Sequence, residues 1–349
     1  MFGTDCAVLN ESMTLPAYQI PNGPFGVVLN ANAGRVTPRL ARSVRRVVGR
    51  DHVFLTESSD HAQEVLELCV EREYQTIFAG GGDGTIVDTI NTLDQHRSTG
   101  TRVPAVGVLR LGTGNAIARW LGSGRNPVRD IATYAAGDVH KSVPLRMVRC
   151  EGTLFPFGGV GYDAAVLNDY YALKNRFANT ALKGLCSGFT GYLLAGLGVT
   201  VPHYMRRPAP EVTVVNLGRP AWRIGPDGKE VGDPIPTGGL LYRGPATFLG
   251  TSTSPVIGYG LRFFPHASER SGRFQLRILN ISALESAWFL PAAARGTFEH
   301  PRLHDFYADR VRVIVDEAMP FQLGGDPKGY RNELVFEMAE RPVTFVGRA

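Results

Sequence analysis

Cysteine is scarce in this sequence, and no two cysteines lie close together. Cys6, Cys69, Cys150 and Cys186 lie far apart and form no CxxC motif. This spacing argues against a structural zinc site and against a disulfide framework. The sequence therefore predicts a reduced, cytoplasmic protein that is held together by its hydrophobic core.

Long apolar runs and a secretory leader are lacking as well. No stretch reaches about eighteen apolar residues without interruption, so the sequence predicts no transmembrane helix. The first residues include Asp5 and Glu11 and lack a basic segment followed by an apolar one, so no signal peptide is expected. At 349 residues the chain is long for a single hydrophobic core, and two domains are expected.

Charged residues are not abundant and are nearly balanced. They make up 20% of the chain, which has 44% hydrophobic residues and a net charge of +5. The positive balance fits anionic partners such as nucleotide phosphates or a membrane surface, and fits plain solubility equally well. An arginine-rich segment at 38–48, which is a predicted helix, raises nucleic acid as a partner, but it lacks the aromatic residues that stack on bases. No nucleic-acid partner is therefore predicted.

Glycine is concentrated in one stretch, Thr76–Leu93, which reads TIFAGGGDGTIVDTINTL. Residues 76–79 predict a buried strand, residues 80–84 an open loop, and Thr85 the N-cap of a helix. A strand, a glycine loop and a helix N-terminus together bind phosphate, because the backbone N–H groups and the helix dipole both favour an anion. Three consecutive glycines exceed what an ordinary turn requires.

Two more loops of small residues follow predicted strands in the same half of the chain. Residues 25–29 form a predicted strand that ends in the loop 30–35, and residues 105–109 form one that ends in the loop 111–115. Predicted helices alternate with these strands. This alternation predicts a doubly wound, mostly parallel sheet for residues 1–137, a nucleotide-binding α/β domain with its three loops along one edge.

From residue 138 the pattern changes to short strands. The segments that read as strands are 143–148, 153–157, 211–216, 246–249, 273–279 and 310–315. Apolar spacing predicts a helical insertion at 164–199, and glycine and proline predict an exposed excursion at 218–243. Residues 138–349 are therefore expected to form an antiparallel, β-rich domain whose last residues could return to the first domain.

Four motifs in order resemble the diacylglycerol kinase catalytic domain, which sphingosine, ceramide and bacterial lipid kinases share. They are GGGDGT at 80–85, NANAG at 30–34, GTGN at 112–115 with Ala118 and Arg119, and GVGYDA at 159–164. The resemblance covers most of the chain. It implies an α/β fold like that of NAD kinases and diacylglycerol kinases, and an ATP- and Mg²⁺-dependent lipid kinase. The acceptor would be a diacylglycerol or a sphingoid or ceramide-type lipid at the membrane surface.

The resemblance assigns roles to specific residues. The nucleotide would be bound by Asn30, Gly34, Gly81, Gly82, Gly84, Thr85, Gly112, Thr113, Gly114 and Asn115. Asp83 is the acid inside the phosphate loop, and it is assigned a catalytic or metal-linked role, with a structural cap as the alternative. Asp163 is placed near the lipid headgroup, with a satisfied turn acid as the alternative. No metal ligand is assigned.

Three acids common in this family are replaced here, at Ala116, Ser271 and Gly324. The family has Asp-Gly-Glu near the end of the chain, and its aspartate is implicated as the base that deprotonates the lipid hydroxyl. This chain has Gly324-Gly325-Asp326 instead. Asp326 could supply the base from a shifted loop, Asp83 could act as the base, or the protein could bind nucleotide and lipid with weak or no transfer.

Other interpretations remain beside the lipid kinase. GGGDGT is similar to loops of NAD kinases and phosphofructokinases, so a kinase of a soluble substrate is the runner-up, although the asparagine-rich signature of NAD kinases is not found. The apolar run 184–201, flanked by Lys183 and Arg206, predicts contact with an acyl chain or an anionic bilayer, or else a core helix. The expected protein is cytoplasmic and peripherally membrane-associated, and a homodimer is left open.

Overall fold

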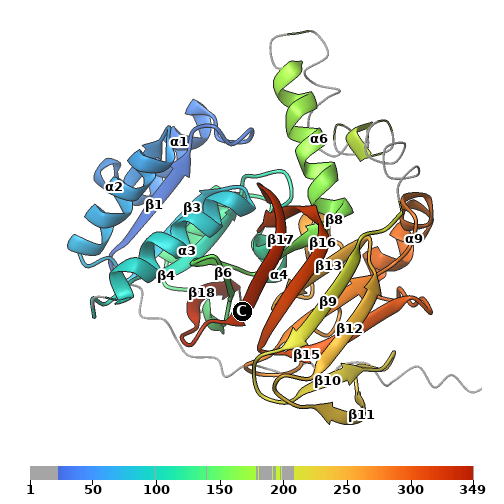
Figure 1. Cartoon of the computed structure of the whole chain (residues 1–349). Coiled ribbons are helices and arrows are strands. Elements are labelled where there is room, and N and C mark those ends of the chain that lie inside the picture. The colour runs from blue at the N-terminus through green and yellow to red at the C-terminus, as the bar shows by residue number, and fades with distance from the viewer. Residues whose placement is uncertain are drawn as a thin grey trace, which may run out of the picture.

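The computed structural model of this chain describes residues 23–98, 100–138, 140–177, 180, 191, 194–196, 198 and 208–348. Figure 1 shows two sheets side by side, with the helices of the first half in blue and cyan and the strands of the second half in yellow to red. The helix α6 (Tyr162–Arg176) rises above the junction between them. The predicted apolar run 184–201 lies almost wholly outside the described residues.

The first sheet has six strands in the order β2-β1-β3-β4-β18-β5. They are β1 (Phe25–Asn30), β2 (Val53–Thr56), β3 (Thr76–Gly81), β4 (Ala105–Arg110), β5 (His140–Leu145) and β18 (Val343–Arg348). The pairings from β2 through β18 are parallel, and β18 pairs antiparallel with β5. The predicted class, a mostly parallel α/β sheet, is therefore confirmed.

Helices cover both faces of this sheet. They are α1 (Pro38–Val48), α2 (Ser59–Glu71), α3 (Asp83–Ser98), α4 (Ala116–Trp120) and α5 (Pro127–Ala135). α1 and α5 bury Val44 and Ile131 in one core, whereas α2 and α3 bury Leu66 and Ile90 in the other. Each core draws on alternate residues of the same strands, which is how a sheet covered on both faces is built.

The second sheet has twelve strands and is antiparallel. They are β6 (Val148–Cys150), β7 (Thr153–Phe155), β8 (Phe157–Gly161), β9 (Glu211–Asn216), β10 (Ala221–Ile224), β11 (Glu230–Ile235), β12 (Leu240–Pro245), β13 (Phe248–Ser252), β14 (Phe274–Leu279), β15 (Leu303–Ala308), β16 (Arg310–Leu323) and β17 (Asp326–Met338). The longest of them, β16, pairs with β17, β8 and β9, so it joins the two halves of the sheet. The predicted antiparallel, β-rich second part is confirmed.

The helix α3 belongs to both cores. Its residues Ile86, Ile90 and Leu93 are buried in the core of the first sheet, and Val87 is buried in the core of the second. Asn91 adds two hydrogen bonds to β7: its amide donates to the Leu154 carbonyl (2.9 Å) and its Oδ1 accepts from the Leu154 N–H (2.7 Å). The glycine stretch therefore leads into the helix that holds the two sheets together.

Several local predictions were wrong. Gly80 and Gly81 belong to β3, and α3 begins at Asp83, so the open loop is shorter than expected and Thr85 lies in the first turn instead of at the N-cap. The excursion at 218–243 contains β10, β11 and the first part of β12. β10 and β11 pair with each other, and β10 also pairs with β15, a strand distant in the sequence, which a local pattern of glycine and proline does not reveal.

The division of the chain at residue 137 stays a prediction. β5 lies after that boundary and still pairs within the first sheet, beside β18 from the end of the described chain. Within the residues that the structure describes, no helix is both long and apolar enough to cross a membrane.

Candidate active site

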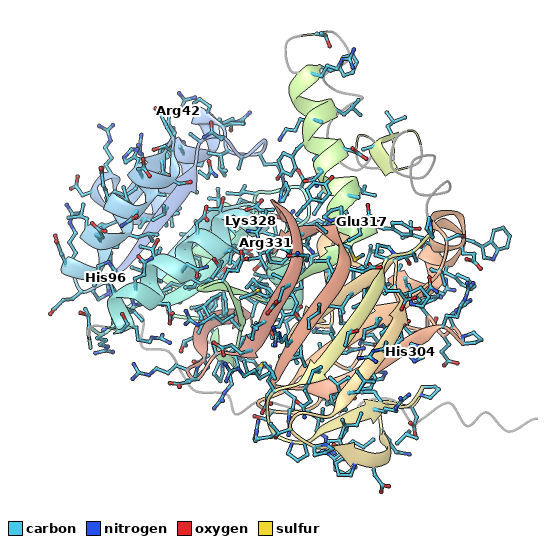
Figure 2. All side chains as sticks on the ribbon, in the orientation of Figure 1. Arg42, His96, His304, Glu317, Lys328 and Arg331 are labelled. Carbon is cyan, nitrogen blue, oxygen red and sulfur yellow. The ribbon has the colours of Figure 1, made fainter. Side chains whose placement is uncertain are left out.

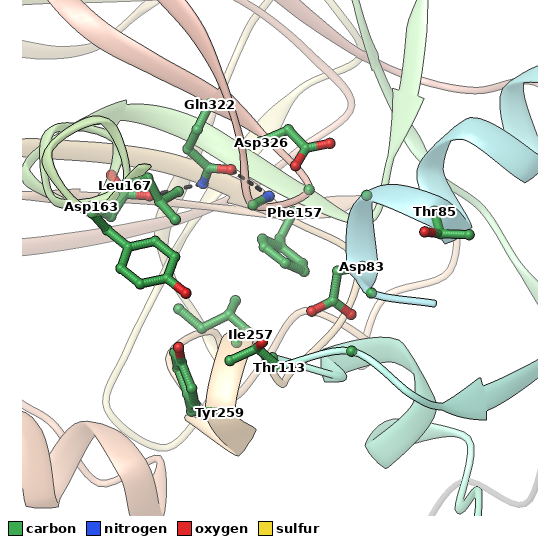
Figure 3. A pocket seen from close by; sticks show the side chains of 18 of the residues that line it. Asp83, Thr85, Thr113, Phe157, Asp163, Leu167, Ile257, Tyr259, Gln322 and Asp326 are labelled. Atoms are coloured by element: carbon green, nitrogen blue, oxygen red, sulfur yellow. Dashed lines mark hydrogen bonds between the residues drawn. The ribbon is translucent and has the colours of Figure 1, made fainter. Parts of the chain in front are cut away.

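A cavity of about 400 Å³ lies between the two sheets. Loops from the first sheet form one wall, and α6, β8, β13, the short helix η4 (Gly258–Gly260) and the turn between β16 and β17 form the other. Figure 3 shows side chains from both walls, among them Asp83, Asp326, Asp163 and Gln322. The fold therefore gathers the three loops of small residues at one site, as the parallel sheet predicts.

The glycines allow two loops to touch. A Cβ on Gly112 would lie 2.2 Å from the Cα of Gly82, and a Cβ on Gly80 would lie 2.5 Å from Leu29 Cδ2. Real Cβ atoms do not approach other atoms this closely, so any larger residue would force the loops apart. Gly34, Gly82, Gly84, Gly112 and Gly114 line the cavity with their backbone.

Two predicted nucleotide-binding residues, Gly81 and Asn115, do not line the cavity. Gly81 lies at the end of β3 and does not line the cavity. Asn115 is buried in the left-handed conformation (φ 50°), where its side chain accepts from the Gly112 N–H (3.0 Å) and donates to the Gly112 carbonyl (2.5 Å). Asn115 therefore stabilises the conformation of the third loop through the Gly112 backbone.

Asn30 connects the first loop to the second. Its amide donates to Thr85 Oγ1 at 2.9 Å, and its Oδ1 accepts from the Asn32 N–H at 2.9 Å. Asn30, Thr85 and Thr113 all line the cavity, so the three loops present side-chain amide and hydroxyl groups together with backbone N–H groups. This combination is suited to a polyanionic phosphate chain.

Asp83 is enclosed at the start of α3. Its Oδ1 accepts from the Ala116 N–H at 2.8 Å, which ties α3 to α4. A Cβ on Gly114 would lie 2.6 Å from Asp83 Oδ2, so that glycine makes room for the carboxylate. Burial raises the pKa of Asp83 to about 6, and the charge of Asp326 adds to the shift against the Ala116 hydrogen bond. Asp83 can therefore take up or release a proton near neutral pH.

Asp326 forms part of a second acidic group, with Asp88 of α3. Both carboxyls line the cavity, and burial raises the pKa of each. The Asp88 charge raises the pKa of Asp326 further, whereas Lys328 and a hydrogen bond from the Tyr171 hydroxyl lower it. Lys328 lies close by on β17, near the hairpin turn (Figure 2). Asp88 was not predicted from the sequence, where its only signal is an acid in the second turn of the helix after the glycine loop.

Asp163 lies in the first turn of α6 and faces the same cavity. Its Oδ2 accepts from Gln322 Nε2 at 2.8 Å, and Gln322 Oε1 in turn accepts from the Gly325 N–H at 2.9 Å (Figure 3). The other oxygen, Asp163 Oδ1, is buried without a hydrogen-bond partner. Burial raises the pKa of this carboxyl. Gln322, also missed, links the carboxyl to the turn that carries Asp326, and no local sequence signal marks it.

The positions where family acids are replaced have structural explanations. Gly324 has a φ of 59°, and a Cβ there would lie 2.5 Å from Val87 Cγ2. Ala116 is fully buried and serves Asp83 through its backbone N–H. Ser271 is exposed and does not line the cavity. Carboxylates from other positions, namely Asp88 and Asp326, line the cavity instead.

A magnesium ion fits the carboxylates that are present. Among the described residues, no three His, Cys, Asp or Glu side chains lie close enough to hold a metal on their own. Mg²⁺ is commonly bound by one or two carboxylates together with substrate phosphates, so it needs no such trio. The repulsion between Asp88 and Asp326, which Lys328 offsets only in part, is what a divalent cation would relieve.

The fold and the site define an α/β protein with a β-rich second part and glycine-rich loops at one cavity, and comparisons with known proteins agree on the fold. Residues 24–147 match the model of the diacylglycerol kinase catalytic domain. In structure, the chain is similar to a putative diacylglycerol kinase from Bacillus anthracis str. Sterne, with a TM-score of 0.63 and 15% sequence identity over 93% of this chain and 96% of that one. This likeness shows the fold.

Relatives in sequence are distant. Diacylglycerol kinase from Bacillus subtilis (strain 168) is 28% identical over 87% of this chain and 89% of its own length. A probable lipid kinase YegS-like protein from Enterobacter sp. (strain 638) is 27% identical over 79% of both chains. Diacylglycerol kinase 2 from Arabidopsis thaliana is 23% identical over 87% of this chain, which spans 43% of that protein's length.

Proposed function

We propose that this protein is an ATP- and Mg²⁺-dependent lipid kinase. It transfers the γ-phosphoryl group to a hydroxyl of a diacylglycerol or of a sphingoid or ceramide-type lipid at a membrane surface. The observation that carries the proposal is the two-sided character of the cavity. Glycine loops with amide and hydroxyl groups form one wall, and the opposite wall includes the apolar side chains Phe157, Leu167, Phe248, Ile257 and Leu261.

The apolar wall favours a lipid over a soluble acceptor. A nicotinamide dinucleotide or a sugar needs polar partners along most of its length, because unpaired polar groups are costly to bury. An acyl chain needs apolar contact, which Leu167 of α6 and Phe248 of β13 provide. The match of residues 24–147 to the diacylglycerol kinase catalytic domain supports the same substrate class.

The nucleotide is assigned to the loop wall. Backbone N–H groups of Gly82, Gly84 and the third loop lie beside the hydroxyls of Thr85 and Thr113, at the N-terminus of α3. These groups hold the phosphates by hydrogen bonds and by the helix dipole. Mg²⁺, when bound with ATP, would neutralise charge that develops on the phosphates, and Asp88 and Asp326 are the residues that would hold it.

Asp83 is assigned as the base for the acceptor hydroxyl. Its carboxyl faces the cavity from the loop wall, and its pKa of about 6 leaves it mostly ionised at pH 7 yet basic enough to accept a proton. Asp163 is assigned to the lipid, because its partnerless Oδ1 can accept a hydrogen bond from a headgroup hydroxyl or amine.

The proposal is tested with radiolabelled ATP and a panel of lipid micelles containing diacylglycerol, sphingosine and ceramide, beside NAD and a hexose. Label on one of the lipids is the expected result. Label on NAD or the sugar alone would assign the protein to the runner-up, a kinase of a soluble substrate. Tight binding of ATP and lipid without any labelled product would instead support the third interpretation, a binding protein without efficient transfer.

Two variants separate the roles of the acids. Asp83→Asn is expected to lower the transfer rate about a thousandfold, the range of a general base, with little change in the affinity for ATP. Asp326→Asn is expected to raise the Mg²⁺ concentration needed for half-maximal rate, and an unchanged magnesium dependence would remove Asp326 from the cation site. Wild-type turnover by Asp83→Asn would show that the base lies elsewhere.

A further inference from the structure

The helix α9 (Ala283–Arg295) has an apolar outer face near the cavity wall. Trp288 is 82% exposed and Leu290 is 36% exposed, and Pro291 and Ala294 are exposed as well. Trp288, Pro291 and Ala294 are spaced by three residues, so they follow one side of the helix. Single exposed apolar residues are ordinary on a protein surface, whereas a contiguous set around a tryptophan indicates a contact surface.

The inner face of α9 is continuous with the cavity. Phe289 and Ala293 pack in one cluster with Phe248 and Phe264, and the last two also line the cavity. Figure 1 shows α9 and α6 at the same end of the larger sheet. A lipid that leaves a bilayer touching α9 would therefore meet apolar side chains along the way to the proposed transfer site.

Cations lie at the end of this face. Arg295 is exposed in the last turn of α9, and exposed Arg262 lies against the capping residue Gly296, whose added Cβ would be 3.2 Å from Arg262 Cβ. The acid in the first turn, Glu285, is paired with Arg302 at 2.8 Å. An apolar helical face with an exposed tryptophan and arginines beside it fits the interface of an anionic bilayer, where the ring lies at headgroup level and the cations meet phosphate.

We propose that the outer face of α9 is the surface through which this protein binds an anionic bilayer. Trp288 inserts at the boundary between headgroups and acyl chains, and Arg262 and Arg295 contact the headgroups. The inference rests on the proposed function, since a lipid acceptor has to pass from the bilayer into the cavity. It goes further by naming the helix and the residues that meet the membrane.

The test measures vesicle binding by the full chain without ATP, so that no transfer takes place. Phosphatidylcholine vesicles with and without phosphatidylserine and brominated lipid are added while tryptophan fluorescence and co-sedimentation are recorded. We expect a blue shift and bromine quenching that require Trp288, and Trp288→Ser should weaken binding about tenfold. Leu240→Ser is the matched control, because Leu240 is 49% exposed on β12, away from α9, and should bind as wild type does.

The charge contribution is tested separately. The pair Arg262→Gln and Arg295→Gln should weaken binding to phosphatidylserine vesicles about thirtyfold, given about 1 kcal/mol for each cation near the surface. Arg302→Gln should have a smaller effect because Arg302 is already paired with Glu285. Thermal unfolding of each variant checks the fold.

Three outcomes would overturn the inference: no vesicle binding by wild type, equal binding by wild type and Trp288→Ser, or a Trp288→Ser effect confined to the oligomeric state in sedimentation. The last would show that a second copy of the chain covers α9. Failure of the proposed function is distinguishable from failure of this inference. Vesicle binding that requires Trp288, without any labelled lipid, would support the membrane-binding surface and contradict the kinase activity. Labelled lipid in micelles, together with vesicle binding that does not depend on Trp288, would support the kinase activity and contradict the membrane-binding surface.

Discussion

Asp83 shows how a single residue carries both chemistry and a stability cost. The glycine loop that precedes it was evident in the sequence, and so was the presence of an acid at a phosphate site. Its enclosure by α4, and hence the raised pKa, depends on Gly114 and on the Ala116 N–H, which lie on another loop. Residue identity was therefore predictable, whereas the electrostatic state of the residue needed the fold.

The raised pKa predicts how Asp83 affects stability. Its pKa rises from 3.8 to about 6 on folding, so the folded protein binds more protons between these values and the free energy of unfolding falls as pH rises through that window. Asp83→Asn removes this loss. Without Mg²⁺ and nucleotide, we expect the variant to exceed wild type by about 2 kcal/mol at pH 8 and to match it at pH 4.

Urea unfolding at a series of pH values measures this difference. A constant difference between wild type and Asp83→Asn across the series would show that the Asp83 carboxyl titrates in the folded protein much as it does in the unfolded chain.

Gln322 is a positioning residue that the sequence did not reveal. Gln322→Leu is expected to cost about 2 kcal/mol, because the buried Asp163 carboxylate would lose its side-chain donor. In the background of Asp163→Asn the same change should cost less, because no charge remains to be satisfied. Equal costs in a double-mutant cycle measured by urea unfolding would contradict the link between the two side chains.

At the scale of elements, the turn between β16 and β17 explains a departure from the family pattern. Gly324 and Gly325 both have positive φ angles, 59° and 90°, which favours glycine at both positions. They differ in their surroundings, since an added Cβ meets Val87 at Gly324 and nothing within 4 Å at Gly325. The absence of an acid at 324 is therefore matched to the packing of α3 beneath the turn.

This contrast gives a matched pair of variants. Gly325→Ala should cost about 1 kcal/mol for the backbone conformation alone, and Gly324→Ala should cost about 1–3 kcal/mol more because of the contact with Val87. Adding Val87→Ala should recover most of that extra cost. Thermal unfolding midpoints test the pair, and equal losses for both glycine variants would rule out the contact with Val87.

Element prediction from sequence succeeded where local patterns were strong. Thr37 and Pro38 mark the start of α1, and the predicted bounds 38–48 match the structure. β17 was missed because its sequence, DPKGYRNELVFEM, lacks alternation and is polar over most of its length. α9 was missed as well, and it contains Pro291, a residue that normally ends helices, although Ser282 and Glu285 form a capping box at its start.

At the scale of the whole molecule, the alternation of strands and helices predicted the first sheet, and the change at residue 138 predicted the second. The membership of individual strands could not be read from the sequence. β18 lies between β4 and β5 with Phe345 fully buried, and its partners are separated from it by the entire second sheet. The sequence predicted only that the last residues of the chain could return to the first domain.

The position of β18 predicts that the first sheet depends on the last residues of the chain. Removal of residues 343–349 should abolish cooperative folding of this sheet, because β4 and β5 would lose the strand that joins them. Phe345→Ala should cost about 3–5 kcal/mol. Amide hydrogen exchange in β4 and β5 and binding of an ATP analogue measure the effect, and a truncated chain with native exchange in β4 would contradict it.

The same feature has a consequence for how the protein is made. A ribosome delivers β1 to β4 first, then the strands of the second sheet, and β18 only after them. At about 5–20 residues per second, the edge of β4 waits on the order of tens of seconds for its neighbour. During that interval the growing chain offers an unpaired strand edge of the kind that attracts other chains. The sheet that carries the glycine-rich loops is therefore completed last although its first strands are synthesised early, and a chain released too early would lack the strand that joins β4 to β5.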